Sequence, residues 1–115
     1  MNALDLFGKH FIEDTRDRTF KTISKMIDGT MKGVTAQQVS QLLSDFTRDQ
    51  IDALCRVVLI SIDYSLGNML TMIEQNDEIV VLCDGENIKD LSDGLSGELY
   101  TEDGWIEKFS RIESD

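Results

Sequence analysis

The residues with the clearest potential for metal chemistry lie near the start of the chain. His10 and Glu13 are three residues apart, so a helix places them on one face, with Asp14 and Asp17 nearby. Carboxylate-bridged metal sites in helical bundles use the order Glu-x-x-His, supported by carboxylates from other helices. Here the order is reversed, no second copy exists, and one histidine is too few for a typical zinc site. We therefore interpret His10 as a surface residue and expect no metal site.

Nucleophilic catalysis needs a serine or cysteine beside a base, and the sequence offers no such pairing. Cys55 and Cys83 have apolar neighbours, which raise the pKa of a thiol. They are typical of small core side chains in a reducing compartment, although a disulfide between them stays open. The GLSG segment at residues 94–97 is one residue too short for a G-x-S-x-G elbow, and no lysine follows it to bind phosphate. We expect no catalytic residue and no cofactor.

An acidic stretch beside two aromatic residues gives the most specific surface hypothesis. The members of this candidate interaction surface are Asp84, Glu86, Asp90, Asp93, Tyr100 and Trp105. Aromatic side chains surrounded by charge are typical of protein interfaces. The alternative for Trp105 is a place in the core, because Trp105 and Phe109 have helical spacing, and this alternative is favoured. The acids do not fit an EF-hand frame, and an irregular calcium site among them stays a further alternative.

The charge of the chain limits its partners. The net charge is −11 over 115 residues, with −4 in residues 1–83 and −7 in residues 84–115. Phosphate backbones and anionic membranes attract Lys and Arg, so nucleic acid and membrane surfaces are disfavoured as partners. A basic protein partner is electrostatically allowed. The length indicates a single domain, residues 1–115, and the absence of a signal pattern at the N-terminus favours the cytoplasm.

Residues 51–73 form the longest apolar stretch and predict a long helix over about residues 48–75. One broad face is apolar, and Val57, Ile60 and Tyr64 form a second stripe on the other side. Such a helix is central in a bundle or lies in a dimer interface. Arg56 and Asp63 interrupt the stretch, which disfavours a membrane span. We expect these two charges to form a polar seam that reaches solvent; a buried Asp63 that fixes the register of a partner is the alternative.

The remaining elements are predicted from periodicity and end signals. Residues 3–28 predict either one helix whose buried face shifts or two short helices. Two capping boxes, at Thr35 with Gln38 and at Thr47 with Gln50, predict the starts of a helix over residues 36–45 and of the long helix. Residues 79–83, followed by Asp-Gly and residues 86–89, predict a hairpin. A last helix is expected from about residue 103, capped by Thr101 or Asp103.

The second half of the chain also carries a resemblance. The string DGLSGELYTEDGWIEKFS at residues 93–110 follows the segments RDQIDALCRVV and SIDYSLGNML. Together they resemble small uncharacterised bacterial proteins of unknown function, over the range from Thr47 to the C-terminus. The resemblance implies a bacterial, cytoplasmic origin. It brings no activity and no site residues.

These observations predict a mainly α fold: a helical bundle around one long central helix, closed by a small C-terminal β-hairpin and a short terminal helix. The expected function is a non-enzymatic, acidic interaction module of inhibitor, immunity or adaptor type that binds a basic protein partner. One alternative is a structural homodimer that pairs through Val57, Ile60 and Tyr64. The other is a small metal-dependent or carboxylate-based enzyme that uses His10 and nearby acids.

Overall fold

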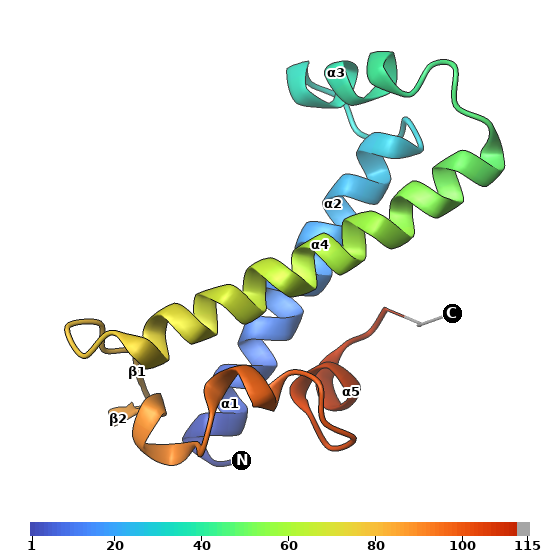
Figure 1. Cartoon of the computed structure of the whole chain (residues 1–115). Helices are drawn as coiled ribbons and strands as arrows, with labels where there is room; N and C mark the ends of the chain where they lie inside the picture. Colours follow the sequence, from blue (N-terminus) through green and yellow to red (C-terminus); the bar gives the residue numbers. More distant parts are fainter. Residues whose placement is uncertain (113–115) are drawn as a thin grey trace.

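The fold is mainly α and is built around one long helix, as the sequence predicts (Figure 1). The computed structural model describes residues 1–112. Helix α4 (Arg48–Gln75) has the predicted bounds. The predicted cap is confirmed as well: Gln50 N donates to Thr47 Oγ1 at 3.2 Å, and Thr47 N donates to Gln50 Oε1 at 2.9 Å. This reciprocal pair satisfies two N–H groups that an uncapped helix leaves without partners.

The N-terminal part is a single rod in three segments, α1 (Ala3–His10), the π-helix η1 (Phe11–Asp17) and α2 (Arg18–Ile27). A π-helix bonds each N–H to the carbonyl five residues back rather than four, so it changes the direction in which the following side chains point. This explains how the apolar face shifts between the two halves of the rod without a break. The one-helix alternative is therefore nearer the structure, although the sequence did not predict the π segment.

The predicted cap of the next helix is wrong. Helix α3 (Val34–Leu42) begins one residue before Thr35, and its N-cap is Gly33, which makes no side-chain cap. Gly33 has a φ of 126°, a left-handed conformation that glycine adopts without strain. The helix also ends at Leu42 instead of residue 45. The backbone turn at Gly33 therefore sets the start of α3, in place of the Thr35 hydroxyl.

The predicted hairpin is confirmed, with shorter strands. Strand β1 (Leu82–Cys83) pairs antiparallel with β2 (Glu86–Asn87), and Cys83 lies opposite Glu86. The turn residues Asp84 and Gly85 have φ values of 53° and 81°, as a type I′ turn requires at both central positions. The return strand passes directly into a 3₁₀ helix, η2 (Ile88–Leu91), which buries Ile88 completely.

The C-terminal segment covers the lower end of α4. It contains a 3₁₀ helix, η3 (Leu95–Glu98), and the predicted last helix, α5 (Trp105–Phe109). The N-cap of α5 is Gly104, whereas Thr101 or Asp103 was expected. A Cβ atom at Gly104 would lie 2.8 Å from the backbone oxygen of Leu99 and from backbone atoms of Thr101. This close backbone contact selects glycine at position 104. The N-cap therefore has no side chain to accept a hydrogen bond, whereas a polar cap at position 101 or 103 was expected.

One hydrophobic core holds these elements together. It joins the rod, the second half of α4 and the C-terminal segment, and its buried members are Phe11, Ile12, Leu66, Leu70, Ile73, Ile88, Leu95, Leu99 and Trp105. The indole of Trp105 packs edge-on against Phe7 and Phe11, with centroid distances of 5.7 and 6.2 Å. A Cβ atom at Gly8 would lie 2.4 Å from the indole ring. The glycine that weakens α1 by propensity is thus the residue that admits the tryptophan.

Burial divides the molecule into two parts, which we call the base and the arm. The base is residues 1–17 with 66–112, and it contains every buried residue of the core cluster. The arm is residues 18–65, and Ala36 is its single buried residue. The radius of gyration is 16.5 Å, against about 13 Å for a compact domain of this length. The arm of α2, α3 and the first part of α4 projects upward from the base (Figure 1).

Candidate interaction surfaces

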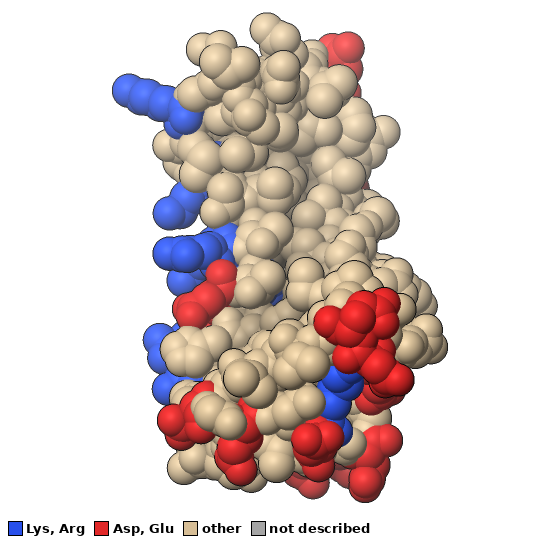
Figure 2. All heavy atoms as spheres, turned by 90° about the vertical axis from the view of Figure 1, so that its left-hand side faces the viewer, with Lys and Arg blue, Asp and Glu red and all other residues tan. Residues whose placement is uncertain are grey.

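The predicted acidic residues gather at one end of the base. Asp84, Glu86, Asp90 and Asp93 are all exposed, on and after the hairpin. Two acids that the sequence analysis did not single out, Asp77 and Glu78, join them from the loop after α4. Figure 2 shows acidic side chains over the lower part of this face with one basic patch among them, while the other visible Lys and Arg side chains follow the left edge. We call the six acids the acidic end.

Apolar side chains stand exposed among these acids. Val80 is 55% and Leu82 is 63% exposed, and Leu91 is exposed as well. Lys89 is the one lysine in residues 77–93; it is partly buried, and its Nζ donates to the Asn76 carbonyl at 2.9 Å. This lysine is therefore engaged in tying η2 to the end of α4. The acidic end thus combines exposed aliphatic groups with surrounding negative charge.

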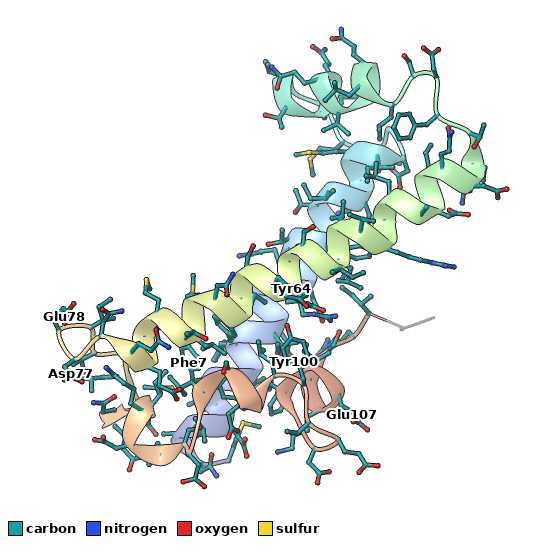
Figure 3. All side chains as sticks on the ribbon, in the orientation of Figure 1. Phe7, Tyr64, Asp77, Glu78, Tyr100 and Glu107 are labelled. Carbon is teal, nitrogen blue, oxygen red and sulfur yellow. The ribbon has the colours of Figure 1, made fainter. Side chains whose placement is uncertain are left out.

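The two predicted aromatic members of the surface are not part of the acidic end. Trp105 is only 1% exposed, so its prediction as a surface residue is wrong and the core alternative holds. Tyr100 is exposed, but Figure 3 places it near Tyr64 and away from Asp77 and Glu78. The Tyr100 hydroxyl donates to the backbone carbonyl of Asp63 at 3.0 Å. Burial raises the pKa of that hydroxyl, and the Asp63 carboxylate adds to the shift.

The second predicted surface is the stripe on α4. Val57 and Ile60 are each 57% exposed and Tyr64 is 68% exposed, so residues 1–112 leave them uncovered. Ala53 is exposed too and extends the stripe by one turn. By helical geometry, these four residues point about 140° away from the core residues Leu66, Leu70 and Ile73. We call Ala53, Val57, Ile60 and Tyr64 the α4 stripe.

A shallow groove continues the α4 stripe towards the base. It has a volume of about 390 Å³ and is lined by Tyr64, Gly67, Asn68, Thr71, Ser96 and Tyr100. Its floor is made of small side chains between two tyrosines. Within the described residues, α4 is also the one helix that meets the length and composition of a membrane span, and 11% of its most apolar window is buried.

A buried polar cluster fastens the rod to α4 and to the C-terminal segment. The Arg16 guanidinium makes a two-pronged ion pair with Asp63, with Nη2 at 3.1 Å from Oδ2. Its Nη1 donates to Ser110 Oγ at 3.0 Å. Asp17 accepts from Ser110 Oγ at 2.9 Å and from the backbone N–H of Arg111 at 2.7 Å. All three guanidinium nitrogens of Arg16 and the carboxylates of Asp17 and Asp63 are therefore hydrogen-bonded within the cluster.

This cluster corrects the predicted polar seam. Arg56 is exposed, but the side chain of Asp63 is only 17% exposed and that of Arg16 only 7%. A buried carboxylate needs a partner, and η1 supplies one from within the same chain. The structural role of Arg16 and Asp17 was not predicted, because both lie in the polar segment at residues 13–18 and Asp17 was considered only as an acid near His10. Because the hydrogen bonds of the cluster are internal, we assign it a structural role.

The metal and thiol candidates remain scattered. His10 Nδ1 lies 2.8 Å from Asp14 Oδ2 on the surface, and Glu13 Oε1 lies 3.4 Å from Arg111 Nη2. Over residues 1–112, no group of three or more His, Cys, Asp or Glu side chains is placed to hold a metal ion. Cys55 and Cys83 are both free and half-buried. Burial raises the pKa of the Cys55 thiol, and the Asp52 carboxylate adds to that effect.

Comparisons with family models, with curated proteins and with solved structures give no match for this chain.

Proposed function

We propose that the protein is a non-enzymatic interaction module whose acidic end binds a basic protein partner. The observation that carries the proposal is the exposure of Val80 and Leu82 on the segment that joins Glu78 to Asp84, so that members of the acidic end flank them on both sides along the chain. Interfaces of this kind have an apolar centre and a polar rim. The apolar centre supplies affinity, and the negative rim selects and steers a partner of opposite charge.

The position of the acidic end supports this role. The hairpin is held by the buried Ile88, whose backbone N–H donates to the Val81 carbonyl at 3.1 Å. Lys89 ties the following turn to the end of α4. The hairpin and η2, which carry Asp84, Glu86 and Asp90, are therefore held in place before a partner binds. This lowers the conformational entropy lost on binding.

Capture from a lysate of the source cell tests the proposal. The protein is immobilised, and partners are eluted over a series of salt concentrations. We expect a basic protein to be retained at low salt and released as salt rises, because salt screens exposed charges. A triple variant, Asp84→Asn with Glu86→Gln and Asp90→Asn, is expected to lose the capture.

A matched variant separates this surface from net charge alone. Asp45→Asn with Asp49→Asn and Asp52→Asn removes the same number of acids from exposed positions on the arm. It should retain the partner at wild-type salt concentrations. Equal loss of capture by both variants, or no basic protein retained at low salt by the wild type, contradicts the proposal.

A further inference from the structure

We propose that the α4 stripe is the interface of an antiparallel, two-fold homodimer, so that a second copy of this chain covers it. This goes beyond the proposed function, because the stripe and the acidic end are separate surfaces. The four residues of the stripe are spaced by four, three and four positions. That alternation is the spacing of the apolar seam of a two-helix coiled coil.

The charge of the stripe favours a second copy over a basic partner. Between residues 53 and 73 the only charged side chains are Arg56 and Asp63, which have opposite signs. Asp63 turns inward to Arg16, so it adds no negative charge to the stripe. The whole chain carries −11, and two copies repel each other wherever their acids meet. The neutral α4 stripe is a place where two acidic chains can approach closely.

The position of the acidic end selects the antiparallel arrangement. The six acids follow the C-terminal end of α4. A parallel pair would place two acidic ends side by side. An antiparallel pair separates them by about the length of α4, roughly 40 Å at 1.5 Å per residue, whereas screening in physiological salt acts over about 8 Å. The antiparallel pair also aligns opposite helix dipoles.

The shape of the surface agrees with a two-fold axis close to Ile60. With the axis there, Val57 of one copy lies level with the partner's Tyr64, and Ile60 lies against the partner's Ile60. Ala53 of one copy then lies level with the groove beyond Tyr64, whose floor contains Gly67 and Ser96. Each copy gives the same patch to the other, as an isologous contact requires.

Sedimentation equilibrium of the whole chain tests the pairing. At about 10 and 100 µM we expect the wild type to have twice the chain mass of 13.0 kDa. Ile60→Glu should sediment as a monomer with unchanged helix content, because Ile60 is exposed in the single chain. Met69→Glu is the matched control, since Met69 is a similarly exposed apolar residue of α4, about 150° from the stripe by helical geometry. This control should remain a dimer.

Cysteine cross-linking tests the orientation. In a background with Cys55→Ser and Cys83→Ser, Ile60→Cys should form a disulfide-linked dimer on oxidation. Ala53→Cys should not, because antiparallel pairing sets the two Ala53 positions about 20 Å apart along the helices, beyond disulfide reach. Efficient cross-linking through Ala53→Cys overturns the antiparallel arrangement. A monomeric wild type at both concentrations, or a monomer that floats with phosphatidylcholine vesicles, overturns the dimer itself.

Discussion

The base and the arm have similar fractions of apolar residues but bury them to different extents. In the base, residues from the rod, the end of α4 and the C-terminal segment meet in one core, where Leu70, Ile88 and Leu95 are fully buried. In the arm, Phe20, Ile23 and Ile27 are only half-buried, and Leu42 and Phe46 are exposed. The difference shows that the three helices of the arm, without a further element packed on them, leave part of their apolar faces exposed. We infer that the base supplies most of the stability and the arm supplies surface.

The largest difference in stability is expected between variants that remove one partner of a buried or of an exposed ion pair. Arg16 of the base pairs with Asp63 at the end of the arm, so this buried pair joins the two parts. Arg16→Ala leaves Asp63 buried without its partner and should lower the free energy of unfolding by about 3–5 kcal/mol. The arm has its own pair, Arg48 with Asp52, but both side chains are largely exposed. Arg48→Ala should therefore cost less than about 1 kcal/mol. Urea unfolding followed by circular dichroism measures both, and equal losses would remove the distinction between base and arm.

Two leucines give the second comparison. Leu70 is completely buried in the base, and Leu70→Ala should cost about 2–5 kcal/mol, because the cavity cannot be refilled. Leu42 is 77% exposed at the end of α3, so Leu42→Ala should change stability by less than about 0.5 kcal/mol. The same urea experiment reads both values. A large loss at Leu42 would show that the arm has packing of its own.

Two glycines sharpen the comparison within the base. Gly8→Ala forces a Cβ into the Trp105 indole and should destabilise by about 1–3 kcal/mol through overpacking. At Gly67 the nearest atoms to an added Cβ are 3.7 and 3.8 Å away, an ordinary contact. Gly67→Ala should be neutral or stabilise by up to about 1 kcal/mol, since alanine favours the helix. Thermal unfolding of the two variants provides the measurement, and a neutral Gly8→Ala would contradict the packing explanation.

The smallest effect concerns the Cys55 thiol in the arm. Its pKa is raised, mainly by burial, so the folded state favours the protonated form. This stability is complete below the pKa of the unfolded chain and is lost as pH rises through the raised, folded pKa. We therefore expect Cys55 to be alkylated by iodoacetamide more slowly than in the urea-unfolded chain at mildly alkaline pH. Mass spectrometry of the Cys55 peptide gives both rates, and an equal rate would show a freely ionising thiol.

Local signals in the sequence predicted the elements well. The Thr47 and Gln50 side chains specify the start of α4 by themselves, and Asp84 with Gly85 specify the hairpin turn, because each acts within a few residues. Val57, Ile60 and Tyr64 were also predicted as a second apolar side of the helix, covered either within the chain or by a second copy, and they are exposed, whereas Ala53 was not singled out. The predicted N-cap at Thr35 was wrong, because the backbone conformation of Gly33 starts the helix earlier.

Contacts between residues far apart in the sequence could not be predicted from such local signals. Gly8 counts as a weak helix residue until Trp105, nearly a hundred positions later, is seen against it. Arg16 lies in a uniformly polar segment, and the only hint of its role was that a buried Asp63 needs a cation. Tyr100 and Trp105 are close in sequence, yet one is exposed near α4 and the other is buried. Their separation depends on the tight turn at Gly104, which no periodicity reveals.

The buried polar cluster also sets an order of events while the chain is being made. Asp17 accepts hydrogen bonds from Ser110 and Arg111, which follow it by 93 and 94 positions. At about 5–20 residues per second, its partners arrive about 5 to 20 s after it is synthesised. Over that interval the Asp17 carboxylate lacks both of these hydrogen-bond donors. The base is therefore the last part of the nascent protein to close.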